Sequence, residues 1–316
     1  MVTKIPDSLV KFCDATTAEK ILSSQALRWS APHLFSDPFE LRYDSQLNFS
    51  EQDLLKATVR HAVTMIFGAE SPAGATPMVQ AIRRWRSEER FDSPDEAESV
   101  LKGLLAQMVS TRQQQIDQLM ETWRSYAQRL RVCCFCSKTD NLEAWQLFAD
   151  NHRGVALRFK AGEETSLPNP KSIIYQEFRP EITRLRDQLD AIIKNKTAAT
   201  NNDFASKFLV KPKQFANQKE WRCMRLQSEK NQANPLAEAS DYNDIRFAGQ
   251  ELAGIYFGIN TSTEVQNKLT KLAISINPKI RIFVGHRHAY QFELQFERLN
   301  PRANSSTANT SSQAVS

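Results

Sequence analysis

Two short apolar segments, Leu9–Phe12 and Leu27–Ala31, lie close to the start of the chain and have the length and composition of strands. Between them, Ile21 and Leu22 follow the capping residue Thr17 at a spacing that predicts a short helix. The second strand runs into Pro32, which favours extended backbone just before it. This strand–helix–strand order predicts a domain that mixes helices with a sheet.

Residues 50–131 have a different pattern, because their apolar positions recur at helical spacing. Helices are predicted at Glu51–Phe67, in a shorter stretch ending near Arg90, and in a long stretch that starts after Ser93. Ser93 is a favourable N-cap, and Pro94 suits the first helical position. The apolar positions that recur at roughly helical spacing in the long stretch are Val100, Leu104, Met108, Ile116, Leu119, Trp123, Tyr126 and Leu130.

Strand patterns return after this helical segment. The predicted strands are 132–137, 154–159, 220–226, 252–258, 280–284 and 288–296, with helices at 141–151, 180–195 and 262–275. In the last strand, Tyr290, Phe292, Leu294 and Phe296 alternate with polar residues and are predicted to face inward. We therefore predict an α+β fold with a mixed, mainly antiparallel sheet. It forms one domain over residues 1–300, with a helical insertion at about 50–131 and a disordered tail at 301–316.

Composition excludes several classes of protein. The chain has 316 residues, of which 41% are hydrophobic and 24% are charged, so it has ample material for a buried core. No apolar run approaches the roughly 20 residues that a membrane helix needs, and the first residues lack the order of a signal peptide. A cytoplasmic protein without a membrane partner is expected. The net charge of +5 does not by itself indicate nucleic-acid binding.

The cysteines of residues 133–136 permit two interpretations. Cys133 and Cys136 form a C-x-x-C pair, which is half of a structural zinc site. No second pair follows at a suitable distance, and Cys134 lies in the same apolar, strand-like run. We therefore favour a buried strand in which the thiols pack as small hydrophobic groups, and we expect no metal.

Residues 35–40 and 145–154 each contain candidate ligand-binding residues next to a predicted turn. Asp37 precedes Pro38 and suits a tight turn anchored by Phe35 and Phe39, although Asp37 and Glu40 are also candidates to face a ligand. In the second segment, Trp145, Phe148 and Ala149 share one predicted helical face. His152 follows near the helix end, where an imidazole either caps carbonyl groups or contacts a ligand, and Gly154 is expected to supply the left-handed exit.

Residues 211–222 carry the most suggestive pattern. Gln218 and Glu220 lie two positions apart, so an extended backbone places both side chains on one face. A carboxylate beside an amide can orient a sugar hydroxyl and an incoming nucleophile. The alternative is that Glu220 forms an ion pair with Arg222 or with a lysine.

Three sequence blocks in order carry a resemblance to a known family. They read L-x-W-S-A-P-x-x-F-S-D-P-F-E at 27–40, C-F-C-S at 134–137 with W-x-x-F-A-x-N-H-x-G-V-A-L-x-F at 145–159, and K-x-K-x-x-x-x-Q-x-E-W-R at 211–222. The chain resembles domain-of-unknown-function family 2971 (DUF2971) over about residues 9–290. Ser36, Phe148 and Gln218 depart from the family pattern, and Gln218 leaves Glu220 as the only carboxylate of its pair.

The order of these blocks also resembles that of ADP-ribosyltransferases, and this resemblance implies NAD as a co-substrate. Glu220 would then bind the ribose and stabilise the oxocarbenium-like transition state, while Gln218 would position the acceptor. Lys11 or Arg28 would hold the diphosphate, and Trp145 or Phe35 would stack on nicotinamide. The other cofactor-binding positions that this resemblance suggests are Asp37, His152, Lys211 and Arg222.

The sequence leaves three functions open. The first is transfer or hydrolysis of ADP-ribose from NAD, with a protein or nucleic-acid acceptor. The second is a non-catalytic module that binds a small nucleotide or a protein, in phage defence or a stress response. The third is nucleic-acid association through the arginines at positions 83, 84, 86, 124, 129 and 131, which more often form a solvated helical face.

Overall fold

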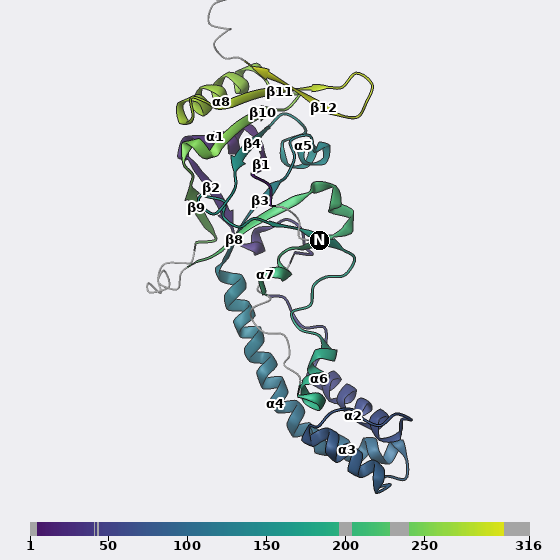
Figure 1. Ribbon diagram of the computed structural model, residues 1–316. Coiled ribbons are helices and arrows are strands. Elements are labelled where there is room, and N and C mark those ends of the chain that lie inside the picture. The colour runs from purple at the N-terminus through teal and green to yellow at the C-terminus, as the bar shows by residue number, and fades with distance from the viewer. Residues whose placement is uncertain (1–4, 41, 43, 196–203, 228–239, 300–316) are drawn as a thin grey trace, which may run out of the picture. The chain divides into compact units, whose positions relative to one another are not determined.

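A computed structural model describes residues 5–40, 42, 44–195, 204–227 and 240–299 (Figure 1). The chain divides into two compact units. Unit 1 comprises residues 1–36, 130–178 and 209–316, and unit 2 comprises residues 37–129 and 179–208. That residues 1–300 form one domain stays a prediction. The predicted disordered tail at 301–316 lies outside the described residues. No helix in the described part of the chain combines the length and apolar character that crossing a bilayer requires.

Unit 1 is built on a large mixed sheet whose described strands pair mainly antiparallel, which confirms the predicted fold class. The strand order is β12-β11-β10-β4-β1-β3-β2-β9, and β8 pairs with β3 outside this path. The strands are β1 (Ser8–Cys13), β2 (Ala26–Ser30), β3 (Leu130–Cys136), β4 (Val155–Lys160), β5 (Lys171–Ser172), β8 (Glu220–Leu226), β9 (Tyr242–Arg246), β10 (Leu252–Phe257), β11 (Arg281–Arg287) and β12 (Leu294–Leu299). A separate parallel pair joins β6 (Ile174–Gln176) to β7 (Val210–Pro212).

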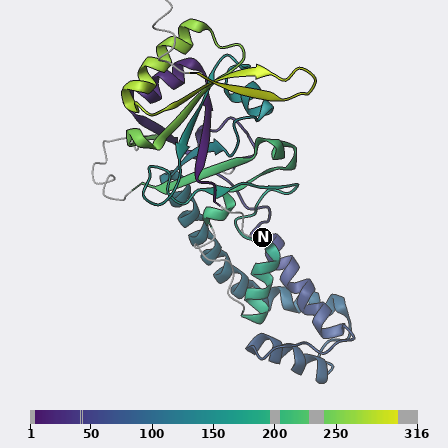
Figure 2. The same cartoon turned by 45° about the horizontal axis from the view of Figure 1, so that its top comes forward.

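Helices cover both faces of this sheet (Figures 1 and 2). On one face, α1 (Ala15–Ser24) and α8 (Thr263–Ile276) pack over a core of aliphatic and aromatic side chains that includes Trp29 and Trp221. On the other face, α5 (Leu142–Phe148) packs against Val10 and Phe12 through Trp145. Apolar residues therefore fill both sides of the central strands, as expected for a three-layered unit.

Strand β3 branches the sheet and places the candidate site. One edge of β3 pairs with β8 along its whole length, from Leu130–Leu226 to Cys136–Glu220. The other edge meets β1 at the pair Val10–Cys136 and β2 at Ser30–Val132. Because directly paired residues lie on the same face, Glu220 shares its face with Cys136 and Val10. The neighbouring residues Trp221 and Lys11 therefore lie on the opposite face.

Unit 2 is helical and contains α2 (Glu51–Phe67), α3 (Pro77–Ser87), α4 (Pro94–Arg129), α6 (Leu185–Lys194) and α7 (Phe204–Lys207). The predicted start of α4 is confirmed, because the Ser93 hydroxyl accepts from the Glu96 N–H at 3.2 Å. Ser50 and Asp53 form a reciprocal capping box at the start of α2. In unit 1, the predicted capping residue Thr17 is not the N-cap of α1. The N-cap is Asp14, whose side chain accepts from the Thr17 N–H.

The apolar positions that recur at helical spacing along α4 are not all buried. Val100, Leu104 and Met108 are exposed, and the buried stripe is shifted by one position to Leu101, Leu105 and Val109. Both stripes have helical spacing, so the pattern alone did not select the one that packs. The buried positions of the second half are Ile116, Met120, Trp123 and Ala127.

The last predicted strand is also corrected. Strand β12 begins at Leu294, not at residue 288, and the preceding residues form the turn between β11 and β12. Tyr290 and Phe292 are almost completely exposed, so the predicted inward alternation holds only from Leu294 onward.

Candidate functional site

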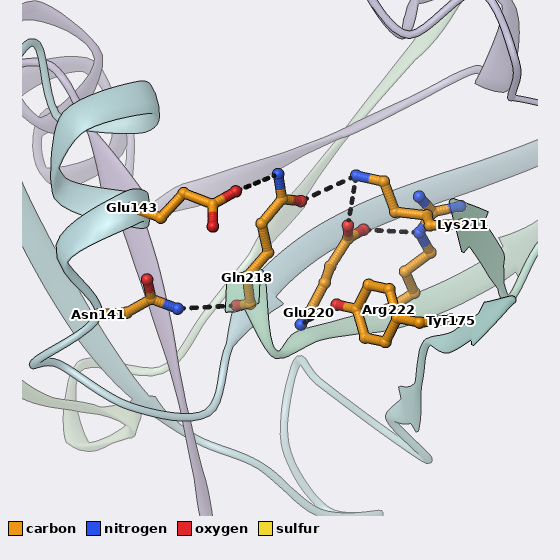
Figure 3. A network of polar contacts seen from close by, with 7 residues as sticks. All are labelled: Asn141, Glu143, Tyr175, Lys211, Gln218, Glu220 and Arg222. Atoms are coloured by element: carbon orange, nitrogen blue, oxygen red, sulfur yellow. Dashed lines mark hydrogen bonds and ion pairs between the residues drawn. The ribbon is translucent and has the colours of Figure 1, made fainter. Parts of the chain in front are cut away.

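The side chains of Gln218 and Glu220 meet at the start of β8, together with Lys211 of β7 (Figure 3). The Lys211 Nζ donates to Gln218 Oε1 at 3.1 Å and to Glu220 Oε2 at 2.9 Å. The Arg222 Nε donates to the second carboxylate oxygen, Glu220 Oε1, at 2.7 Å. The sequence alternative of an ion-paired Glu220 is thus confirmed, with both an arginine and a lysine as partners.

The backbone conformation that brings Gln218 to Glu220 differs from the predicted one. Gln218 ends the 3₁₀ helix η3 (Lys213–Gln218), and Lys219 adopts a left-handed conformation with φ of 48°. Gln218 and Glu220 therefore do not lie on one face of a single extended strand, as the spacing predicted. They are brought together by this turn and by the ammonium group that they share.

The network is buried and extends to α5. The Glu220 side chain is 8% exposed, the Lys211 side chain 11%, and the Arg222 side chain 1%. Gln218 donates from Nε2 to Glu143 Oε1 at 3.2 Å. Asn141, the N-cap of α5, donates to the Gln218 carbonyl at 3.1 Å. These contacts hold the end of η3 against the start of α5.

Tyr175 fixes the backbone at the same place. The Glu220 N–H donates to the Tyr175 hydroxyl at 2.9 Å, and the Ile173 N–H donates to the Glu220 carbonyl at 3.0 Å. Burial raises the pKa of Tyr175 to about 12, so the phenol is neutral at physiological pH. Sequence reasoning missed Tyr175, Glu143 and Asn141, and only Asn141 carried a signal, because asparagine is a favourable N-cap and Asn141 is the first residue of a predicted helix.

The electrostatics keep Glu220 ionised. Burial alone raises the pKa of a carboxyl group, but the charges of Arg222 and Lys211 and their hydrogen bonds outweigh it and lower the pKa of Glu220 to about 2. A carboxylate that is charged over the whole physiological range can hold two cations or stabilise developing positive charge.

This lowered pKa predicts a specific loss of stability in acid. The contribution of the ionised Glu220 to the free energy of unfolding is fully present above the ordinary pKa of 4.5. It is lost as the pH falls from there towards about 2. The difference in free energy of unfolding between the wild type and Glu220→Gln is expected to shrink by roughly 3 kcal/mol between pH 6 and pH 2. Chemical denaturation at a series of pH values measures this gap, and a gap independent of pH would contradict the assigned ion pairs.

Phe35 and Asp37 form local contacts. The guanidinium carbon of Arg222 lies 5.4 Å from the centre of the Phe35 ring, so Phe35 contacts the network through a cation. Asp37 Oδ1 accepts from the Phe39 N–H at 2.9 Å, which confirms the predicted turn. Phe39 itself is exposed and does not anchor that turn in a core.

The two candidates for holding a diphosphate, Lys11 and Arg28, do not join the Glu220 network. Lys11 lies on the opposite face of the sheet, where it donates to the Cys134 carbonyl at 3.1 Å. Arg28 pairs with Asp244 through two hydrogen bonds of 2.9 and 3.0 Å. Lys11 therefore cannot share a ligand with Glu220 across the sheet, and Arg28 is held by an acidic partner on β9.

Trp145 is completely buried and has no face open to a ligand. Its Nε1 donates to the Thr139 carbonyl at 2.7 Å, and its ring stacks parallel to the imidazole of His152 at 6.1 Å. The predicted stacking on nicotinamide is therefore corrected to a core contact. Phe148, predicted on the same buried face, is exposed.

His152 lies in an unusual turn that ends α5 earlier than predicted. Asp150, Asn151 and His152 are all left-handed, with φ of 46°, 50° and 66°. Aspartate, asparagine and histidine tolerate this conformation better than most residues. The His152 backbone N–H, and not the imidazole, donates to the carbonyl of Trp145 at 3.1 Å. Burial lowers the pKa of His152, which favours a neutral ring.

Gly154 is needed for close packing, and not for a left-handed exit as predicted. It has no positive φ, but a Cβ atom there would lie 2.3 Å from the carbonyl oxygen of Cys13. Gly258 approaches the turn in the same way, because its Cβ would lie 2.1 Å from the His152 carbonyl oxygen. The left-handed turn is thus packed directly against neighbouring backbone.

The cysteine segment forms the buried strand β3, as predicted. Burial raises the pKa of the Cys136 thiol to about 12, so it is protonated at neutral pH. Within the described residues, no three histidine, cysteine or acidic side chains are grouped so as to hold a metal ion.

The comparisons with known proteins identify one segment. Residues 144–223 match the model of a family described as "Protein of unknown function (DUF2971)". The chain is similar to this family over these residues. No curated protein and no solved structure matches it.

The DUF2971 match runs from α5 into β8 and so contains most of the network. The network residues inside it are Tyr175, Lys211, Gln218, Glu220 and Arg222. Trp145 and His152 also lie within it, whereas Lys11, Arg28, Phe35 and Asp37 lie outside. The wider resemblance over residues 9–290 stays a prediction.

The arginines considered for nucleic-acid association have different surroundings, and Arg83, Arg84 and Arg124 among them are exposed. Arg83 and Arg86 donate to backbone carbonyl groups, and Arg84 pairs with Glu88 at 2.8 Å. Arg131 is buried in unit 1, whereas the others belong to unit 2. Arg124 contributes to a surface hollow of about 440 Å³ in unit 2, lined also by Gln46, Leu47, Phe49, Asp117, Gln118, Met120 and Glu121.

Proposed function

We propose that unit 1 is a non-catalytic nucleotide-binding module and that residues 211–219 form its contact segment. The observation that carries this proposal is the state of the Glu220 carboxylate. Both of its oxygens are engaged by cations and its side chain is 8% exposed, so it holds Lys211 in place and does not face a substrate.

The chemistry of the segment supports an anionic ligand with an aromatic base. Lys211, Lys213 and Lys219 carry three positive charges within nine residues that include no acidic side chain. The Lys211 ammonium has three donors, of which Gln218 and Glu220 take two. It also lies 5.4 Å from the centre of the Phe215 ring. A phosphate at the lysines and a base beside Phe215 would use both features.

Cleavage of NAD is the second candidate, and one specific observation favours it. A carboxylate that stabilises an oxocarbenium-like transition state must be ionised at neutral pH, and Glu220 meets this condition with its pKa of about 2. In this function, the diphosphate of NAD would compete for Lys211 and release one carboxylate oxygen towards the ribose.

Calorimetric titration with NAD, ADP-ribose and ATP, together with an assay of nicotinamide release, separates the two functions. For the binding module, we expect saturable binding without release of nicotinamide, weakened at least tenfold by Lys211→Met. The control is Lys268→Met, because Lys268 is an exposed lysine on α8 that pairs with Glu19. This variant should bind as the wild type does.

Release of nicotinamide by the wild type that is lost in Glu220→Gln would instead establish the second candidate. Glu251→Gln is the matched control, because Glu251 is a buried carboxylate of unit 1 that accepts from Ser166 and Ala248. If none of the three nucleotides binds to the folded wild type and no nicotinamide is released, both functions are overturned.

A further inference from the structure

The turn between β11 and β12 presents two aromatic side chains to solvent. Tyr290 is 95% exposed and Phe292 is 99% exposed. The β11–β12 hairpin reaches beyond the rest of the sheet of unit 1, as the yellow ribbon shows in both views (Figures 1 and 2). Two fully exposed rings so close together leave a large apolar area in water, and exposure of this kind marks an interaction site.

The hairpin tip, defined here as residues 288–293, is held by its own hydrogen bonds. The His288 N–H donates to the Glu293 carbonyl at 3.0 Å and closes the hairpin. The Nδ1 of His288 accepts from the Tyr290 N–H at 3.2 Å and from the Gln291 N–H at 3.0 Å. The rings are therefore carried on an ordered turn, which lowers the entropy cost of binding a partner.

The order of side chains at the tip indicates the chemistry of that partner. Aromatic and hydrogen-bonding residues alternate as Tyr290, Gln291, Phe292 and Glu293. Nucleobases offer flat faces for the rings and polar edges for the amide and the carboxylate, whereas the interior of a lipid layer offers no partner for those polar groups. Arg287, exposed at the end of β11, supplies a positive charge next to the tip.

We propose that the hairpin tip binds single-stranded nucleic acid, with Tyr290 and Phe292 stacking on bases and Arg287 contacting the phosphate backbone. Stacking on aromatic residues does not depend strongly on sequence, and bases are available for it only when they are unpaired. This inference rests on the hairpin alone and is independent of the nucleotide contacts proposed for residues 211–219.

Fluorescence anisotropy with labelled 12-nucleotide single strands of DNA and RNA, and with the matching duplexes, tests this proposal. The intact wild-type chain is expected to bind the single strands more tightly than the duplexes. The double variant Tyr290→Ala/Phe292→Ala should lose roughly a hundredfold in affinity, or about tenfold for each ring. The substitutions Tyr290→Phe and Phe292→Tyr should retain binding, because they retain the stacking faces.

Two controls distinguish the tip from other surfaces. Phe178 is 80% exposed and belongs to unit 1 but not to the hairpin, so Phe178→Ala should leave the affinity unchanged. Arg287→Gln should weaken binding. It should also reduce the slope of log affinity against log salt concentration by about one, the value for one phosphate contact. Lys268→Met removes an exposed lysine on α8 outside both proposed sites, so it should bind the strands as the wild type does.

Three outcomes would overturn the inference. They are no binding of single strands at 50 mM salt, equal affinity of the double alanine variant, and equal affinity for single strands and duplexes. Co-sedimentation with vesicles of phosphatidylcholine and phosphatidylserine gives a further check. Vesicle binding that is lost in the double variant, without binding of oligonucleotides, would assign the tip to a membrane surface instead.

Discussion

Glu220→Gln is expected to lower the free energy of unfolding of unit 1 by about 3–5 kcal/mol at pH 7. The substitution removes the negative charge that faces two buried cations, Lys211 and Arg222, at 2.9 and 2.7 Å. Removing one partner of a buried ion pair is costly because the remaining charge stays out of water. Urea denaturation followed by tryptophan fluorescence measures the change, since Trp221 lies next to Glu220 on β8.

The matched control for this prediction is Glu251→Gln. Glu251 is as buried as Glu220, but its carboxylate accepts from the hydroxyl and N–H of Ser166 and from the N–H of Ala248, so the same substitution leaves no charge behind. We expect its cost to be less than half as large. In addition, Lys211→Met combined with Glu220→Gln should cost less than the sum of the two single changes. Strict additivity would show that the lysine and the carboxylate do not interact.

Gly258→Ala is expected to destabilise unit 1 by about 3 kcal/mol or more. The new Cβ would lie 2.1 Å from the carbonyl oxygen of His152 and 2.7 Å from its carbonyl carbon. That carbonyl accepts from the Asn260 N–H at 3.0 Å, and it belongs to the left-handed turn. Relief of the clash needs a shift of backbone on both sides, which is more costly than the movement of a side chain. Thermal melting and urea denaturation both measure this loss.

Gly103→Ala is expected to change the free energy of unfolding in the opposite direction from Gly258→Ala. Gly103 lies inside α4, and its Cβ would have no neighbour within 4 Å. Alanine is preferred over glycine in a helix by about 1 kcal/mol, so this variant should be slightly more stable than the wild type. If Gly258→Ala and Gly103→Ala changed the free energy of unfolding equally, the close approach of Gly258 to the His152 carbonyl would not be the cause of the destabilisation.

The local signals in the sequence located most elements of the fold. Ser93 and Pro94 marked the start of α4, and the strand pattern of residues 220–226 gave the bounds of β8. The errors occurred where two patterns were equally good or where a turn interrupted one. The stripes of Leu104 and Leu105 on α4 have the same spacing, and only the packing of unit 2 decides which is buried.

The candidate site was predicted in part. Glu220 and its two possible cationic partners could be named, because opposite charges so close in sequence often pair. Tyr175 could not be found, since its contact with Glu220 depends on the pairing of β6 with β7 and of β5 with β8. Lys11 was misassigned because the face on which it lies depends on the register between β1 and β3.

The position of β1 in the sheet has a consequence for synthesis of the chain. β1 is made before both of its partner strands, because it lies between β4 and β3 in the sheet, and the lysine that it carries contacts Cys134, 123 residues later. At about 5–20 residues per second, a ribosome needs roughly 6–25 s to reach these partners. During that time α2, α3 and most of α4 emerge, and their helical contacts are local. Helices of unit 2 can therefore form on the ribosome while β1 is still unpaired and exposed to chaperones.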